Sequence, residues 1–350
     1  MENIEDILIH KDISIREAIK KLDCTAKKIL LVVENKRLIG TITDGDIRRW
    51  ILNNGDFEKE VFNIMNMHPK YVSEKDLCNS KVIMENYSIE ALPIVNENKE
   101  LIDIIFLNDK INEKNKIHKN ITNPVVIMAG GKGTRLYPYT KILPKPLIPI
   151  GDESIIERII DRFRKFGCTN FYFTVNYKKN MIKAYFDDMS KDYEINYIEE
   201  EKFLGTAGSL YLLKNRINET FFVSNCDVLI EADYYDILKY HKEKKNKITM
   251  VTSLKNYKIP YGVIKLNNNG QVEQTIEKPE YSYLINAGFY ILEPDVLKDI
   301  PENKFFHITD LINKYLEEGK RVGTYPIREN AWFDMGEFKE MDRMLENIVK

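Results

Sequence analysis

The chain has 350 residues, of which 43% are hydrophobic and 30% are charged, and its formal net charge is -2. At about 150 residues per domain, this length predicts two domains. Residues 1–120 contain 19 basic and 21 acidic residues, and residues 121–350 contain 33 of each. Neither part has the positive excess that draws proteins to nucleic acid or to an anionic membrane, so we expect neither partner.

The N-terminus and the cysteines favour a cytoplasmic protein. The first residues, MENIEDILIHKDISIREA, contain acids and lack the basic start and long apolar run of a signal peptide. No stretch has the 18 apolar residues of a membrane-spanning helix. The four cysteines and five histidines lack the spacing of a zinc site or a disulfide framework. We therefore expect buried free thiols in a reducing compartment.

The N-terminal third contains an internal repeat. The segment LVVENKRLI at 31–39 recurs 63 positions later as IVNENKELI at 94–102. Each copy predicts a strand, a polar turn and a second strand that enters a helix, and each follows an amphipathic helix, at 15–22 or 77–84. A unit of about 60 residues buries little apolar surface alone, so we expect two copies, at about 1–62 and 63–118, to pack together.

A polar segment at 108–123, NDKINEKNKIHKNITN, predicts the boundary between a module at 1–120 and a domain at 121–350. After it, apolar strands alternate with helical segments. The strands are predicted at 125–128, 171–176, 195–199, 221–224, 248–254, 263–266, 271–277 and 285–292. The helices are predicted at 155–166, 179–189, 206–213, 234–244 and 309–318. This alternation is typical of an α/β domain with a mostly parallel sheet, which binds ligands at the carboxyl ends of its strands.

A glycine-rich loop, GGKG at 130–133, follows the first predicted strand of this domain. Three glycines in four residues allow backbone N–H groups to approach a phosphate chain. Lys132, Arg135 and Lys145 bring cationic donors to the same region. The loop matches neither the Walker A pattern nor G-x-G-x-x-G. Together with the proline-fixed turn at 144–146, these residues indicate a phosphate site rather than an ordinary strand-to-helix turn.

The stretch 130–147, GGKGTRLYPYTKILPKPL, resembles the signature of the sugar-1-phosphate nucleotidyltransferases, G-G-x-G-T-R-L-x-P-x-T-x-x-x-P-K-P-L, at every fixed position. The resemblance extends to the C-terminus and implies a Rossmann-like, GT-A-like fold with a mixed, mostly parallel sheet. It also implies that Arg135 stabilises the pyrophosphate leaving group and that Lys145 contacts phosphate. The implied nucleotide-binding residues are Met128, Ala129, Gly130, Gly131, Lys132, Gly133, Thr134, Gly205 and Thr206.

Two carboxylates resemble the Mg²⁺ ligands of this family. Asp227 follows a predicted strand in SNCD at 224–227, and Asp334 lies in WFDMG at 332–336, which resembles a W-x-D-x-G segment. Each alone is typical of a cap or a turn, but both occur in the order of the family. The resemblance further implies a catalytic role for Lys278 on the sugar phosphate. The implied sugar-binding residues are Tyr261, Gly262, Glu277, Asn286 and Gly288.

The resemblance implies Mg²⁺-dependent transfer of a nucleotidyl group from a nucleoside triphosphate to a sugar-1-phosphate. The attacking phosphate oxygen is already an anion, so the reaction needs positioning and charge neutralisation rather than a general base. The chain most resembles guanylyltransferases that use GTP and glucosamine-1-phosphate for legionaminic acid biosynthesis. Mannose-1-phosphate or heptose-1-phosphate as acceptor, and UTP, CTP or dTTP as donor, are the alternatives.

Two other classes of function compete with this interpretation. A non-catalytic nucleotide-sensing regulator would have no need for the metal ligands Asp227 and Asp334. A glycosyltransferase would usually hold its metal with Asp-x-Asp, whereas the first position here is Asn225. Both alternatives are therefore less favoured than nucleotidyl transfer.

The segment GTITDGDIRR at 40–49 resembles the end of a CBS domain, so the repeat resembles a tandem CBS (α+β) module. Thr43 and Asp46 match residues that contact the phosphate and ribose of an adenine nucleotide. The equivalent positions of the second copy hold Asp103, Phe106 and Asp109, so we expect at most one cleft for AMP, ADP or ATP. Alternatively, the module only forms a homo-oligomer, a dimer or tetramer, and T-x-x-D at 43–46 is a helix N-cap.

Overall fold

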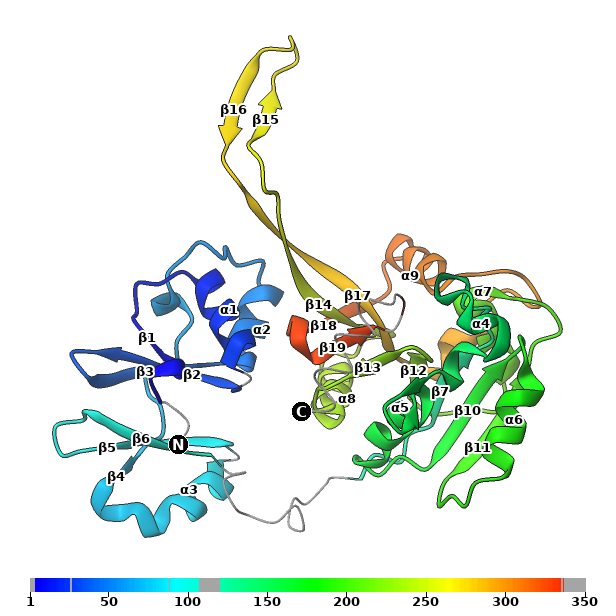
Figure 1. Ribbon diagram of the computed structural model, residues 1–350, viewed down its shortest axis with the longest axis horizontal. Helices are drawn as coiled ribbons and strands as arrows, with labels where there is room; N and C mark the ends of the chain where they lie inside the picture. The colour runs from blue at the N-terminus through cyan, green and yellow to red at the C-terminus, as the bar shows by residue number, and fades with distance from the viewer. Residues whose placement is uncertain (1–3, 26, 88, 107–119, 335, 337–350) are drawn as a thin grey trace. The chain divides into compact units, whose positions relative to one another are not determined.

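The computed structural model describes residues 4–25, 27–87, 89–106, 120–334 and 336 (Figure 1). The chain divides into two compact units, residues 1–117 and 118–350, each with its own β-sheets. The sequence places this boundary at 120/121, within the same polar segment. No helix in the described ranges has the length and apolar character needed to cross a membrane.

The N-terminal unit contains one structural pattern twice. Its strands are β1 (Leu8–Ile9), β2 (Ile29–Glu34), β3 (Arg37–Thr43), β4 (Val72–Ser73), β5 (Ala91–Val95) and β6 (Leu101–Phe106). Its helices are α1 (Ile15–Thr25), α2 (Asp44–Leu52) and α3 (Ser80–Tyr87). In both copies a parallel pair, β1–β2 or β4–β5, is followed by an antiparallel pair, β2–β3 or β5–β6. The sequence repeat is therefore a structural repeat.

The two copies contact each other through their hairpin turns. The backbone N–H of Leu38 donates to the carbonyl of Lys99 (3.2 Å), and the N–H of Leu101 donates to the carbonyl of Lys36 (2.9 Å). The predicted packing of one copy against the other is thus observed. The helix predicted at 77–84 is partly wrong, because residues 74–79 form a 3-10 helix before α3 begins at Ser80.

The second unit is built on a seven-stranded sheet with the order β11-β10-β7-β12-β17-β14-β18. Its strands are β7 (Val125–Ala129), β10 (Asn170–Val175), β11 (Glu194–Glu199), β12 (Phe221–Asn225), β14 (Ile248–Lys258), β17 (Glu280–Leu292) and β18 (Val322–Ile327). Only β17 runs antiparallel to its neighbours, which are β12 and β14. The predicted mixed, mostly parallel sheet is confirmed.

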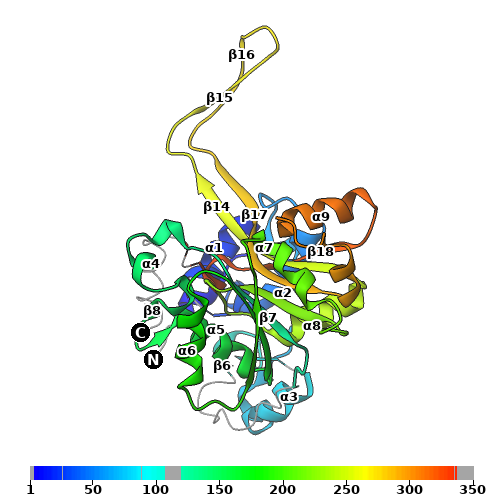
Figure 2. The ribbon, with the colours of Figure 1, turned by 90° about the vertical axis from the view of Figure 1, so that its right-hand side faces the viewer.

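Helices cover both faces of this sheet (Figure 2). The helices of this unit are α4 (Tyr139–Ile142), α5 (Ile155–Arg164), α6 (Lys179–Asp187), α7 (Gly205–Gly208), α8 (Tyr234–Lys244) and α9 (Ile308–Glu317). Alternate residues of β7 point to opposite cores. Val125 and Ile127 join the core that includes α5, α6 and α8, and Val126 joins the core that includes α7 and α9. Both faces of β7 are buried, which explains its continuous apolar run.

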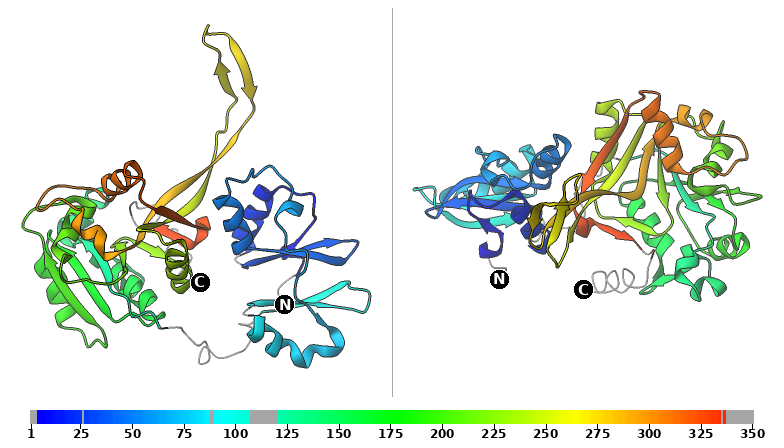
Figure 3. Two further views of the ribbon diagram at one scale, coloured as in Figure 1. Left: turned by 180° about the vertical axis from the view of Figure 1, so that it is seen from behind. Right: turned by 90° about the horizontal axis from the view of Figure 1, so that it is seen from above.

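The outer part of the hairpin β14–β17 forms a long arm. Beyond it, β15 (Val263–Leu266) pairs with β16 (Val272–Ile276) in a separate two-stranded sheet. Figure 3 shows this arm projecting away from the sheet of its own domain. The strands predicted at 248–254 and 285–292 were too short, since the ladder continues to Lys258 and begins at Glu280. The added residues are mostly polar or exposed, so they carry no buried-strand pattern.

Further differences concern short elements and the cysteines. The helix predicted at 206–213 is α7 followed by a 3-10 helix at 209–213, because the small residues of α7 pack tightly against residues 304–306. Two antiparallel pairs were not predicted: β8 (Pro149–Ile150) with β9 (Glu153–Ser154), and β13 (Val228–Ile230) with β19 (Trp332–Asp334). Cys168 and Cys226 are buried free thiols, but Cys24 is exposed, contrary to expectation.

Candidate functional site

The glycine loop follows β7 directly, and two of its glycines are required by close packing. Gly133 has φ +64°, and a Cβ there would lie 2.8 Å from Cγ2 of Thr140 and 3.1 Å from Cβ of Lys145. A Cβ on Gly130 would lie 2.4 Å from Oε1 of Glu200, whereas a Cβ on Gly131 would meet nothing within 4 Å. The loop therefore folds tightly at both ends and leaves open space at its centre.

Two carboxylates lie close to each other at the end of β12. Asp227 immediately precedes β13, and the register of β13 with β19 pairs Val228 with Asp334. Burial raises the pKa of the Asp334 carboxyl, and the charge of Asp227 raises it further. The N–H of Gly336, which donates to Oδ1 of Asp334 at 2.7 Å, opposes this shift. The structure thus brings together two acidic groups, of which Asp227 is buried and Asp334 is half-buried.

Two cations accompany these carboxylates. Nζ of Lys145 forms a buried ion pair with Oδ2 of Asp227. A Cβ on Gly336 would lie 2.8 Å from Nη1 of Arg135 and 3.0 Å from Oδ1 of Asp334, so the guanidinium lies beside the second carboxylate. The sequence predicted all four charged residues as site residues, and the structure brings them together next to the glycine loop. Lys132 and Thr134 are exposed on that loop.

The carboxylate oxygens of Asp227 and Asp334 are ligands of the kind that a magnesium ion prefers. The described residues contain no group of three or more His, Cys, Asp or Glu that could hold a metal ion. Magnesium commonly takes only one or two protein carboxylates and completes its octahedron with waters and substrate phosphates. The mutual repulsion of Asp227 and Asp334, seen in the raised pKa of Asp334, is what a bound dication would relieve.

The predicted nucleotide-binding residues outside the glycine loop lie at the end of β7 and at the start of α7. Gly205 has φ +81°, and a Cβ there would meet the carbonyl oxygen of Phe306 at 2.7 Å. The hydroxyl of Thr206 accepts a hydrogen bond from the N–H of Ile308 (3.0 Å) at the start of α9. The side chain of Thr206 is therefore already engaged within the fold. Met128 and Ala129 end β7, directly before the glycine loop.

Glu200 is a candidate that the sequence analysis missed. Its buried carboxylate lies against Gly130 through Oε1, and Oε2 accepts a hydrogen bond from the N–H of Leu204 (3.2 Å). Burial raises the pKa of this carboxyl, and the Leu204 N–H opposes the shift. An acid at the carboxyl end of the predicted strand 195–199 was the available signal. The structure thus places an acceptor between the glycine loop and the Gly205 segment.

The predicted sugar-binding residues form two separate groups. Tyr261, Gly262, Glu277 and Lys278 lie on the arm, where a Cβ on Gly262 would be 3.0 Å from Oε2 of Glu277. Nζ of Lys278 lies 4.0 Å from Glu277, and this side chain is 60% exposed. The expected approach of Lys278 to the phosphate site is therefore not observed, because the arm projects from the domain (Figure 1).

The second group lies at the base of the arm. Oδ1 of Asn286 accepts a hydrogen bond from the N–H of Gly288 (3.1 Å). Gly288 has φ +74°, and a Cβ there would meet Nδ2 of Asn225 at 2.6 Å. Asn225 ends β12, two residues before Asp227. Asn286 and Gly288 therefore lie beside the strand that carries the first carboxylate.

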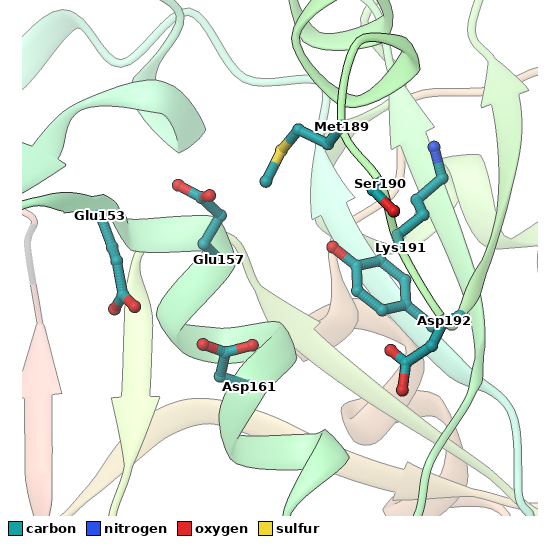
Figure 4. A pocket seen from close by; sticks show the side chains of 8 residues that line it. Glu153, Glu157, Asp161, Met189, Ser190, Lys191 and Asp192 are labelled. Atoms are coloured by element: carbon teal, nitrogen blue, oxygen red, sulfur yellow. The ribbon is translucent and has the colours of Figure 1, made fainter.

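An acidic hollow of about 420 Å³ in the same domain is lined by Glu153, Glu157, Asp161, Met189, Ser190, Lys191, Asp192 and Tyr193. In Figure 4, Glu157 and Asp161 project from α5, and Asp192 lies across the hollow from them. None of the predicted site residues lines it. Because its carboxylates would repel a triphosphate, the hollow does not suit a phosphate substrate.

In the N-terminal unit, the predicted effector residues bind each other. The backbone N–H and the hydroxyl of Thr43 both donate to Oδ2 of Asp46, at 2.8 and 2.7 Å. This contact stabilises the start of α2 and is the N-cap role that the sequence left open. In the second copy, Asp103 accepts from the N–H of Ile104 (2.8 Å), and Phe106 lies under the ammonium of Lys27. Asp109 lies outside the described residues.

Comparisons with known proteins agree with this architecture. Residues 124–349 match the nucleotidyl transferase family, and residues 4–53 match the CBS domain. The chain therefore belongs to the nucleotidyl transferase family and carries an N-terminal CBS domain.

Two relatives give this match more detail. A bifunctional protein GlmU of Methanococcus maripaludis is 36% identical over 222 residues, which cover 60% of this chain and 51% of the relative. A mannose-1-phosphate guanyltransferase of Pichia angusta is 34% identical over 224 residues, which cover 61% of each chain. The chain thus spans about half the length of the first relative and three-fifths of the second.

The solved structure of HddC from Yersinia pseudotuberculosis shares the fold. It has a TM-score of 0.52 and 23% identity, and the match covers 65% of this chain and all of that chain.

The two carboxylates are expected to affect stability in opposite directions in metal-free buffer. Because the pKa of Asp334 is raised, its charged form is disfavoured in the folded protein, so Asp334→Asn should raise the Tm at neutral pH. Asp227→Asn should lower stability by about 3 kcal/mol, because it leaves the buried Lys145 ammonium without its charged partner. Thermal and urea denaturation with EDTA measure both effects.

The advantage of Asp334→Asn should shrink as the pH falls, because the wild-type carboxyl then takes up its proton and loses the unfavourable charge. A lower Tm for Asp334→Asn at neutral pH would contradict the electrostatic description of the site.

Proposed function

We propose that the chain is an enzyme that transfers the nucleotidyl group of a nucleoside triphosphate to a sugar-1-phosphate. The observation that carries this proposal is the grouping of Arg135, Lys145, Asp227 and Asp334 beside a glycine loop that has open space at Gly131. The names of the relatives, which include a mannose-1-phosphate guanyltransferase, support the same reaction class.

In this reaction, an oxygen of the sugar phosphate attacks the α-phosphorus of the nucleotide. A bond forms between them, and the bond from the α-phosphorus to the bridging oxygen breaks, so that pyrophosphate leaves. The nucleophile is already anionic, and the chain therefore has to orient the reactants and neutralise charge. We propose that the guanidinium of Arg135 and the ammonium of Lys145 hold the departing phosphates.

Asp227 and Asp334 would hold Mg²⁺, which when bound neutralises phosphate charge and helps to orient the triphosphate. Gly130 and Gly133 give the loop its tight shape, and this shape exposes the backbone at Gly131. Asn286 and Gly288, beside Asn225, are the described sugar-binding candidates nearest in the fold to Asp227. We propose that the sugar lies between them and the arm.

A matrix of substrates tests the proposal. GTP, CTP, UTP, dTTP and ATP are each combined with glucosamine-, mannose- and heptose-1-phosphate at saturating Mg²⁺, and pyrophosphate release is measured. We expect turnover with GTP, and glucosamine-1-phosphate is the acceptor that we propose. Asp227→Asn should abolish release while the protein remains folded. Asp192→Asn, which removes the same charge from an exposed position, should stay within about twofold of wild type.

Turnover of Asp227→Asn at the wild-type rate would remove Asp227 from the reaction. No turnover of the wild-type chain with any pair would favour the nucleotide-sensing regulator.

The position of Glu200 supports guanine as the base. A carboxylate accepts hydrogen bonds and donates none when ionised. Guanine offers two adjacent donors, N1–H and N2–H, whereas uracil and thymine offer one donor between two carbonyl oxygens that a carboxylate repels. We propose that the carboxylate of Glu200, beside Gly130, accepts from the edge of guanine.

Exchange of this carboxylate for an amide should change the choice of nucleotide. Glu200→Gln should lower kcat/KM for GTP by about 10- to 100-fold, because the amide nitrogen would face a donor of the base. The loss with UTP or dTTP should be smaller. Glu201→Gln, at the neighbouring exposed position, is the matched control and should keep the GTP preference. An unchanged preference in Glu200→Gln would exclude this contact.

We also propose that the N-terminal module regulates the enzyme in the cytoplasm, where nucleotides are abundant. A ligand that binds two states of the enzyme with different affinity shifts their populations. Calorimetry of the full chain with AMP, ADP and ATP should detect one site, and Asp46→Ala should weaken it by removing the carboxylate and its contact to the hydroxyl of Thr43. Absence of heat with all three nucleotides would leave homo-oligomerisation as the proposed role of the module.

A further inference from the structure

Residues 134–143, which connect the glycine loop to the proline-fixed turn, are mostly exposed. This 134–143 segment carries Arg135. It contains a 3-10 turn, Thr134–Leu136, and the single turn of α4. Tyr137, Tyr139 and Ile142 are 61%, 56% and 72% exposed, and only Leu136 and Thr140 are buried. Packing alone therefore holds this segment weakly.

A turn from a different part of the chain binds the segment from outside. Residues 176–178 follow β10, which lies beside β7 in the sheet. The N–H of Tyr177 donates to the carbonyl of Gly130 (3.4 Å), before the segment. The hydroxyl of Tyr177 donates to the carbonyl of Thr140 (3.2 Å), within it. The hydroxyl of Thr140 in turn donates to the carbonyl of Gly133 (3.0 Å).

Lys178 makes the closest of these contacts. Its ammonium donates to the carbonyls of Lys141 and Ile142, both at 2.7 Å. These carbonyls belong to the end of α4, where helical partners are missing and the partial charge is negative. Lys178 has φ +52°, a backbone conformation that side chains with a Cβ disfavour. A lysine therefore occupies a position whose backbone conformation glycine would adopt without strain.

We propose that Lys178 and Tyr177 are positioning residues for nucleotidyl transfer. They hold the 134–143 segment so that Arg135 stays beside Asp334 and the glycine loop keeps its tight fold. Lys178 acts through the backbone of α4 and does not touch the substrate. The inference rests on the proposed function for its kinetic effect, but its structural effect, the ordering of the segment, is independent of that function.

Replacement of Lys178 by glycine separates positioning from stability. Glycine adopts the left-handed conformation freely, so Lys178→Gly should not lower the Tm. It should lower kcat for pyrophosphate release by about 10- to 100-fold and leave KM for the sugar phosphate within about twofold. Lys178→Arg, which keeps the charge and more than one donor, should stay within about threefold of wild type.

Lys245→Gly is the matched control, because Lys245 also has a left-handed backbone, with φ +53°, but lies at the end of α8. It should keep the wild-type kcat. Trypsin cleavage of the native protein after Arg135 and Lys141 measures the order of the segment directly. Lys178→Gly should speed this cleavage, and Lys245→Gly should not.

Unchanged cleavage in Lys178→Gly would overturn the proposal. Faster cleavage with a wild-type kcat would overturn the positioning role. A wild-type chain that turns over no substrate pair would refute the proposed function instead, and the cleavage rates would then decide whether Lys178 orders the segment.

Discussion

The pairing of β13 with β19 is the constraint on which the charged site depends. It places Asp334, from the C-terminal part of the domain, opposite Val228 and therefore next to Asp227. Val228 and Phe333 are buried in the core that includes α5 and α8, so the position of both carboxylates is fixed by apolar packing. Lys145 and Arg135 then approach from the segment after the glycine loop, and their charges offset part of the repulsion.

The same arrangement is electrostatically unfavourable, so the surrounding contacts have to stabilise it. The buried carboxylate of Asp227 and the half-buried carboxylate of Asp334 repel each other, and this repulsion contributes to the raised pKa of Asp334. Backbone strain also occurs nearby, at Lys178, which has a Cβ and a positive φ. Such features persist where the surrounding contacts determine the structure strongly, and they are typical of binding sites. Here those contacts come from β7, β10 and β12, whose carboxyl ends lie side by side.

Much of the fold could be predicted from the sequence, because its signals are local. The apolar runs of β7 and β12 are buried on both faces, and the helix periodicity of α5 reflects one buried face. The glycine loop and the two aspartates were found because their motifs are contiguous. Glu200 and Lys178 carry no such motif, since their positions depend on how distant segments meet in the sheet. The polar ladder of the arm was missed for the related reason that exposed strands lack an apolar pattern.

The most direct test of the site is the binding of Mn²⁺, a paramagnetic substitute for Mg²⁺, followed by electron paramagnetic resonance in the presence of a non-hydrolysable GTP analogue. If Asp227 and Asp334 share one metal, the wild-type chain with nucleotide binds one ion. Asp227→Asn and Asp334→Asn should each weaken that site by at least about tenfold, a loss of about 1.4 kcal/mol. Wild-type Mn²⁺ affinity in both variants would contradict the assignment of these carboxylates to a shared metal and phosphate site.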